Sequence, residues 1–201
     1  LLMRKGEYEA AEPLFREALA MRRKLLGGDA VAVAKSLEGL AMILYNQGKY
    51  DEALPAMRRG VALQRGLHKE PHTDLAEALG NLGLVLSDMG EYHEAETLYR
   101  EALQMKRVLL GDTHPEIALS LNNIAYALAD QKKYDEAIKV VSGPSPESFV
   151  PLFADARGDV LVAQGKVADA KGAYQIALDK LPKSSAWRNV VEVKRDALGG
   201  K

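Results

Sequence analysis

The feature that most limits how this chain can fold is an internal repeat, in which a tyrosine followed three residues later by an alanine returns at equal intervals. A fixed period of 20–50 residues is typical of arrays in which each repeat packs only on its neighbours. We therefore expect a stack of similar units. The repeated tyrosines are Tyr8, Tyr50, Tyr92 and Tyr134, and the alanines are Ala11, Ala53, Ala95 and Ala137.

Within each period, apolar residues recur at three- and four-residue spacing, which predicts two amphipathic helices joined by a short Gly/Lys turn. Leu79, Leu82 and Leu86 mark the first helix of one period, and Leu98 and Leu103 mark the second. Small residues recur on both helices, as close antiparallel packing requires. Period-two alternation is absent, so the sequence predicts an all-α fold: an α-solenoid of antiparallel helix hairpins in a right-handed superhelix.

The last third departs from this period. The second helix of the fourth repeat is expected to stop at Ser142–Pro146. A shorter hairpin is then expected over residues 149–164 and 167–181, followed by a C-terminal capping helix over 184–198. At the other end, Leu1–Lys5 looks like the tail of a first helix, so we expect exposed apolar surface there and self-association through this N-terminal edge.

Turn and cap residues fit the same scheme. Loops such as 110–115 supply a helix stop, cap-type Asp or Thr residues, and a proline near the next helix start. Pro13 and Pro55 hold equivalent places in successive periods. We expect both near the first turns of their helices, with Pro55 late enough to bend its helix.

Composition narrows the function. The chain has 27 Lys+Arg against 28 Asp+Glu and a net charge of −1, so it offers no electrostatic footprint for nucleic acid or an anionic membrane. Without cysteine, thiolate chemistry is excluded and the chain could fold in a reducing or an oxidising compartment, with a bacterial cytoplasm slightly favoured over a periplasm. The sequence also predicts no membrane-spanning helix.

Pro71 separates His68 from His72, so no metal site is expected, nor any cofactor. Neither nucleotide-binding nor hydrolase motifs occur, and we expect no enzyme activity.

The remaining candidate site is the concave face that the first helices would line together. Side-chain amides suit it, because an amide both donates and accepts hydrogen bonds and can pair with the backbone of any extended peptide. Asn81 and Asn123 occupy corresponding places in successive periods. The alternative is that these asparagines bond only within or between helices, and the repeated tyrosines are expected to be packing residues. The candidate groove residues are Glu38, Tyr45, Asn46, Asn81, Asp88, Asn122, Asn123 and Tyr126.

Residues 1–140 resemble tetratricopeptide repeats (TPRs) of the kinesin-light-chain type, on the spacing of the repeated tyrosines and on segments such as Leu110–Pro115 and Gly90–Tyr92. The resemblance implies a solenoid that binds peptides, and Asn81 and Asn123 match the groove asparagines with which such domains hold peptide backbone. Lys35, Glu77 and Leu119 do not match the basic residues of the subgroup that clamps an acidic chain end.

Residues 138–198 instead resemble the C-terminal part of the YfgM-type ancillary translocon subunit, on Phe153–Leu161 and Val193–Leu198. That resemblance implies a periplasmic helper of the translocon and its chaperones. Two subfamilies in one chain suggest a chimera joined near 129–138, with natural divergence as the alternative. The expected division is a kinesin-light-chain-like array over 1–142, whose first repeat is incomplete, and a terminal hairpin with capping helix over 143–201, packed as one continuous solenoid.

The sequence therefore predicts a non-enzymatic scaffold that binds an extended or helical segment of another protein. Two alternatives stay open. One is a chaperone or export helper of the YfgM type, and the other is an engineered or self-associating repeat protein without a natural ligand.

Overall fold

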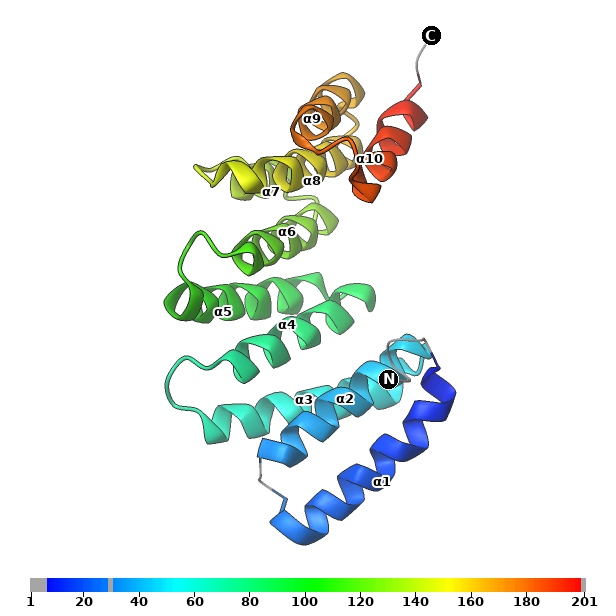
Figure 1. Cartoon of the computed structure of the whole chain (residues 1–201), viewed down its shortest axis with the longest axis vertical. Coiled ribbons are helices and arrows are strands. Elements are labelled where there is room, and N and C mark those ends of the chain that lie inside the picture. The colour runs from blue at the N-terminus through cyan, green and yellow to red at the C-terminus, as the bar shows by residue number, and fades with distance from the viewer. Residues whose placement is uncertain (1–6, 29–30, 200–201) are drawn as a thin grey trace. The chain divides into compact units, whose positions relative to one another are not determined.

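The computed structural model describes residues 7–28 and 31–199. Over these residues it contains ten α-helices, one short 3-10 helix and no strand, so the predicted all-α fold of helix hairpins is confirmed (Figure 1). The chain divides into two compact units, residues 1–109 and 110–201, which we describe one at a time. The expectations for Leu1–Lys5 lie outside the described residues. The expected division at residue 142 rests on family resemblance and stays a prediction.

Unit 1 is built from hairpins of nearly equal length. The second-type helices α1, α3 and α5 each begin at one of the repeated tyrosines, and the first-type helices α2 and α4 pack between them through buried leucine and alanine stripes. Leu37, Leu40 and Leu44 are buried on α2, as the periodicity predicted. The bounds are α1 Tyr8–Leu26, α2 Val31–Asn46, α3 Tyr50–Leu67, α4 Thr73–Asp88 and α5 Tyr92–Leu110.

The helices of a hairpin approach most closely where a glycine faces an aromatic ring. A Cβ placed on Gly83 would lie 2.7 Å from Cε1 of Tyr99, and one placed on Gly158 would lie 2.3 Å from Cε1 of Tyr174. Both tyrosines are buried, and each follows its glycine at the same separation along the chain. In the repeat before Gly83, the same two positions hold Ala41 and Met57. Where the first helix carries alanine in place of glycine, the second helix thus carries methionine in place of tyrosine.

Ion pairs join successive second-type helices of unit 1. Arg16 on α1 pairs with Glu52 on α3 at 2.6 Å, and Arg58 on α3 pairs with Glu94 on α5 at 2.7 Å. These two pairs occupy equivalent places, because each partner is displaced by one full period. The neighbouring Glu12 also accepts from Lys49 at 2.7 Å. The repeat is therefore visible in the surface ion pairs as well as in the buried residues.

Two sequence expectations need correction. Pro13 and Pro55 each stand inside their helix, α1 and α3, in the second turn, so Pro13 lies later than expected, whereas a late place was already expected for Pro55. At the starts of α4 and α6 the caps are histidines and not Asp or Thr: the backbone N–H groups of Asp74 and Glu116 donate to Nδ1 of His72 and His114. The imidazole nitrogen takes the place of a cap oxygen because it is an equally accessible acceptor at the same backbone position.

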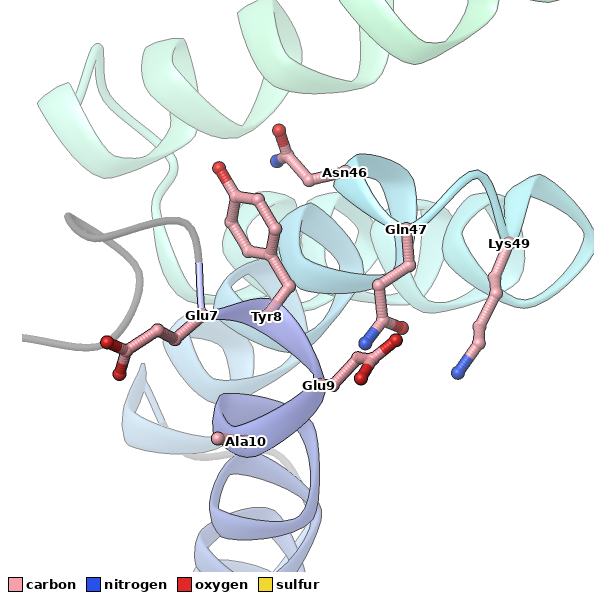
Figure 2. A pocket seen from close by; sticks show the side chains of 7 residues that line it. All are labelled: Glu7, Tyr8, Glu9, Ala10, Asn46, Gln47 and Lys49. Carbon is pink, nitrogen blue, oxygen red and sulfur yellow. The ribbon is translucent and has the colours of Figure 1, made fainter.

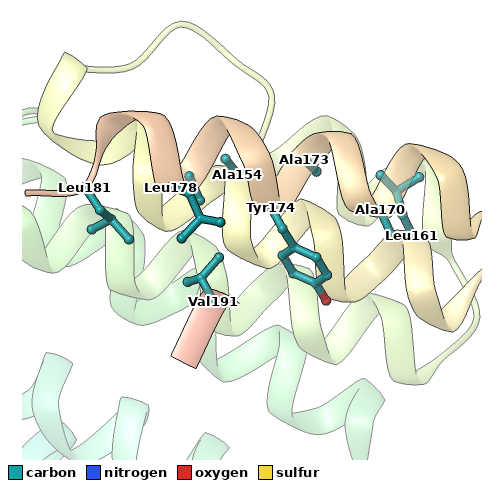
Figure 3. Close-up of a cluster of buried hydrophobic side chains, with 9 residues drawn as sticks. Ala154, Leu161, Ala170, Ala173, Tyr174, Leu178, Leu181 and Val191 are labelled. Atoms are coloured by element: carbon teal, nitrogen blue, oxygen red, sulfur yellow. The ribbon is translucent and has the colours of Figure 1, made fainter. Parts of the chain in front are cut away.

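Unit 2 differs from unit 1 in the length of its elements. The second-type helix α7 has only seven residues, as the sequence predicted, and a loop and a 3-10 helix connect it to a last hairpin and a capping helix. Figure 3 shows the core of that hairpin, where Tyr174 and Leu178 pack beside Val191 of the capping helix. The bounds are α6 Pro115–Asp130, α7 Tyr134–Val140, η2 Glu147–Phe149, α8 Val150–Ala163, α9 Val167–Lys180 and α10 Ala186–Ala197.

Candidate functional site

In unit 1, a hydrogen bond joins the two first-type helices at their C-terminal ends. The hydroxyl of Tyr45 on α2 donates to Oδ2 of Asp88 on α4. That bond is the main cause that raises the pKa of Tyr45, to about 12, so the phenol stays a donor at neutral pH. The two predicted groove residues are thus brought together, and the bond fixes the orientation of α2 against α4.

Unit 2 contains a similar bond between its own first-type helices. The hydroxyl of Tyr126 on α6 donates to Oδ2 of Asp159 on α8 at 2.9 Å. Burial and the charge of Asp159 raise the pKa of Tyr126 far above its usual value. Tyr126 nevertheless keeps 36% of its surface exposed and so remains available for contact.

The asparagines at corresponding positions have free amides. In the part of the chain that the structure describes, the side chains of Asn81 and Asn123 have no hydrogen-bond partner. Asn81 is partly exposed on α4 of unit 1, and Asn123 is exposed on α6 of unit 2. The alternative in which these amides bond within or between helices therefore gains no support.

The other predicted polar residues are engaged locally. Glu38 is half-buried and accepts a 2.9 Å hydrogen bond from Nε2 of Gln64, and burial raises the pKa of its carboxyl. Asn46 donates to the backbone carbonyl of Met42 at 2.7 Å. Asn122 is only 6% exposed, and its Oδ1 is buried without a partner. Because its Oδ1 is closed to a ligand, the proposal below rests on Asn81 and Asn123 and not on Asn122.

A cavity of about 540 Å³ opens in unit 1 where α1 begins and α2 ends. Figure 2 shows the ring of Tyr8 near Asn46, with Glu9 beside Gln47 and Lys49 beyond Gln47. Asn46 thus lines a hollow as well as donating to the backbone of its own helix. The mixture of one aromatic ring, one amide and both charge signs suits a polar peptide segment better than an apolar ligand.

A charged cluster anchors the capping helix in unit 2, and sequence reasoning missed it. The ammonium of Lys194 on α10 lies 2.9 Å from Oδ1 of Asp155 and 2.8 Å from Oδ2 of Asp159, both on α8. Tyr174 donates to the other oxygen of Asp159 at 2.8 Å. Burial raises the pKa of Asp155, whereas for Lys194 the two aspartates outweigh burial and raise the pKa. The i, i+4 spacing of the aspartates was visible in the sequence, but their partner two helices later was not.

The two histidines that Pro71 separates do come together. The rings of His68 and His72 are stacked, with centroids 3.6 Å apart, and Asp74 lies beside them. Stacked, nearly parallel rings place their nitrogen lone pairs in two separate parallel planes, whereas a tetrahedral metal needs ligands that converge on one point. Nδ1 of His72 also accepts the cap hydrogen bond, and Asp74 pairs with Lys35 at 2.9 Å. This arrangement does not fit a metal ion.

None of the described helices has the length and apolar character needed to cross a membrane.

Comparison with known proteins finds similar proteins of both expected kinds, an ancillary translocon subunit and a putative kinesin light chain. A curated protein, the ancillary SecYEG translocon subunit of Neisseria gonorrhoeae, is 37% identical over 62 residues, which cover 31% of this chain and 30% of that protein. The match thus spans less than a third of the relative's length.

Solved structures are similar in fold. A putative kinesin light chain with nearly identical TPR-like repeats from Podosopora anserina has a TM-score of 0.79 at 17% identity, covering 96% of this chain and 90% of that one. BtubC (BKLC) from P. vanneervenii has a TM-score of 0.70 at 20% identity, covering 100% and 78%. Identities this low show a shared fold alone.

Family profiles identify the chain more directly. The profile described as a tetratricopeptide repeat-like domain matches residues 112–200. The profile described as a tetratricopeptide repeat matches residues 1–66 and 74–141, more than half of the chain. The period, the hairpins and the glycine–aromatic contacts agree with this match, and the chain belongs to the tetratricopeptide repeat family.

Proposed function

We propose that this protein is a non-enzymatic scaffold that holds an extended segment of another protein against its first-type helices. The observation that carries the proposal is the pair of unpartnered amides, Asn81 in unit 1 and Asn123 in unit 2. An exposed amide can donate to and accept from a peptide backbone whatever the peptide's side chains are.

The surroundings of each amide support the same use. Leu84 on α4 stands three residues after Asn81 and is 37% exposed, and Tyr126 holds the equivalent place after Asn123. Residues three apart on a helix share a face, so each amide lies beside an apolar or aromatic surface. A bound segment would gain backbone hydrogen bonds from the asparagine and side-chain burial against its neighbour.

In each unit, the helix that carries the unpartnered asparagine is already fixed to a neighbouring first-type helix by a hydrogen bond. The Tyr45–Asp88 bond in unit 1 and the Tyr126–Asp159 bond in unit 2 hold adjacent first-type helices together before any ligand arrives. Preorganisation of this kind lowers the entropy cost of binding.

A peptide array followed by affinity measurement tests the proposal. Peptides captured by the parent chain are titrated against an Asn81→Ala/Asn123→Ala variant. Losing the neutral backbone hydrogen bond made by the asparagine of one unit, worth about 0.5–1.5 kcal/mol, should weaken binding to that unit about 2- to 13-fold. Asn189→Ala, an exposed asparagine on α10, is the matched control and should leave affinity unchanged.

The outcomes separate clearly. Equal affinity of the parent and the double variant, at equal melting temperature, would move recognition away from these asparagines. Failure to capture any peptide would favour the interpretation as a repeat protein without a natural ligand.

A second candidate function is a folding or export helper, favoured by the 37% identity to the ancillary SecYEG translocon subunit. A helper of this kind would suppress the aggregation of an unfolded client at a stoichiometric ratio. Light scattering of a chemically denatured client diluted into buffer, with and without the chain, distinguishes it from a scaffold that recognises one segment.

A further inference from the structure

The early end of α7 leaves a hollow in unit 2. The second-type helices of unit 1 have 18 or 19 residues, whereas α7 has seven and ends at Val140. The chain then turns through residues 142–146 before η2 and α8. A cavity of about 250 Å³ opens at this turn, and its lining includes Val141 and Ser142 of the turn and Ile176 of α9.

One wall of this cavity is apolar. It is formed by Val150 and Phe153 of α8 and by Ile176, which is 41% exposed at the opening. Covering an exposed isoleucine beside a concave apolar wall with an apolar group removes apolar surface from water and is therefore favourable. The cavity is smaller than the roughly 300–1,000 Å³ of sites for drug-sized ligands, so a single branched side chain is the size of group that fits.

The cavity also has a charged group in its lining, the guanidinium of Arg157 on α8. Arg157 is partly buried, and no side chain in the described part of the chain pairs with it. The other arginines of unit 2 are compensated, since Arg188 pairs with Glu192 and Arg195 with Asp196. A guanidinium always carries its charge, and a partly desolvated one favours a planar anion that accepts two hydrogen bonds.

The rim supplies further donors. The hydroxyl groups of Ser142 and Ser145 are exposed at the cavity, and neither has a hydrogen-bond partner among the described residues. The cavity therefore combines an apolar wall, a free guanidinium and free hydroxyls within one small volume.

We propose that this cavity is a binding site for a carboxylate carried next to a branched apolar group, with the carboxylate on Arg157 and the apolar group against Val150, Phe153 and Ile176. Either a chain end with a leucine-like last residue or a free branched carboxylic acid supplies this chemistry. The site uses neither Asn81 nor Asn123 and is separate from the proposed groove.

Nuclear magnetic resonance titration of the whole chain with N-acetyl-leucine tests the proposal. We expect saturable shifts of the Gly143 and Val150 amides and of the Arg157 Nε–H. N-acetyl-leucinamide, which lacks the charge, should bind about tenfold or more weakly. This comparison needs no variant and so cannot fail through misfolding. Equal binding of acid and amide, or shifts confined to other parts of the chain, would overturn the proposal.

Variants and a second ligand sharpen the result. Arg157→Met keeps the apolar stem and should abolish the preference for the acid, whereas Lys139→Met, an exposed cation on α7, should leave it intact. Tighter binding of N-acetyl-leucine than of 4-methylpentanoate would identify a chain end as the ligand, and equal binding would identify a free acid. The Asn81→Ala/Asn123→Ala variant should bind N-acetyl-leucine normally, which separates this test from that of the groove.

Discussion

Among single residues, Gly83 leaves no room for a side chain where it meets the ring of Tyr99. We expect Gly83→Ala to destabilise the chain by about 1–3 kcal/mol, because the new methyl group would overlap a ring that is packed on all sides. Chemical denaturation monitored by circular dichroism measures the change. Gly80→Ala, on the same helix with nothing within 4 Å, is the matched control and should be neutral or stabilising.

The preceding repeat suggests how to restore stability. Ala41 and Met57 occupy there the positions of Gly83 and Tyr99. Adding Tyr99→Met to Gly83→Ala should therefore recover part of the loss, and a double-mutant cycle would show favourable coupling. Strictly additive effects would show that the two positions do not constrain each other.

The histidine caps give a second prediction at this scale. His114→Ala should cost about 0.5–2 kcal/mol, because the N–H of Glu116 loses its acceptor at the start of α6. The distance of 3.3 Å favours the lower half of that range. His114→Asn restores a side-chain acceptor and should retain most of the stability in the same denaturation assay. A full loss in the asparagine variant would indicate that the ring contributes by packing instead.

Single residues also show where sequence reasoning reached its limit. The small residues and leucines of the helix faces were predictable, because spacing along a helix fixes which side chains share a face. Asn122 was not, since it adjoins Asn123 but lies about 100° around the helix and is buried. The histidine caps were missed because histidine is an uncommon cap and its acceptor nitrogen depends on ring orientation.

Between elements, the ion pairs that link α1 to α3 predict an acid-sensitive contact. Hydrogen bonds from Lys49 and Arg16 lower the pKa of Glu12 from 4.5 to about 2. A lowered carboxyl pKa stabilises the fold above the unfolded value, and this contribution is lost as the pH falls from about 4.5 towards 2. Denaturation midpoints across this range should fall less steeply for Glu12→Gln than for the parent. Parallel profiles would show that Glu12 does not hold α1 against α3.

The capping helix depends on the cluster around Lys194. Lys194→Met removes the cation between Asp155 and Asp159, and we expect a loss of about 1.5–3 kcal/mol, the range for hydrogen bonds to charged groups. The side chain of Lys194 is 31% exposed, so the cost should stay below that of breaking a fully buried pair. Lys183→Met, in an exposed loop, is the control, and thermal melting measures both. Adding Asp155→Asn should reduce the penalty; an unchanged penalty would place the effect elsewhere.

At this scale the sequence anticipated the helices well and their side-chain links poorly. The short α7 and the capping helix α10 both follow from breaks in the repeat pattern. The partners of Lys194 could not be predicted, because the contact joins α8 to a helix outside the repeat, whose packing no period describes. The hollow beside α7 was hidden for the same reason, since it depends on the path of one irregular loop.

For the whole molecule, the exposed apolar face of α1 predicts self-association. Leu14 is 55% exposed, Met21 52% and Leu25 78%, and their spacing puts them on one side of the helix. Static light scattering should show an average mass that rises with concentration, and a Met21→Lys/Leu25→Lys variant should remain monomeric. Val193→Lys, on an equally exposed site of α10, is the control. A constant monomer mass for the parent would remove self-association from the interpretation.

The ion pairs between second-type helices have a consequence for how such a chain can lengthen. Arg58 repeats the place of Arg16, and Glu94 repeats the place of Glu52. If a segment of one period were duplicated, the new copy would supply a glutamate that pairs with the arginine of the preceding segment. It would also supply an arginine that pairs with the glutamate of the following segment. Gene duplication or deletion of whole repeats could then change the number of hairpins while leaving every junction chemically complete, so the length of the array is free to evolve separately from its sequence.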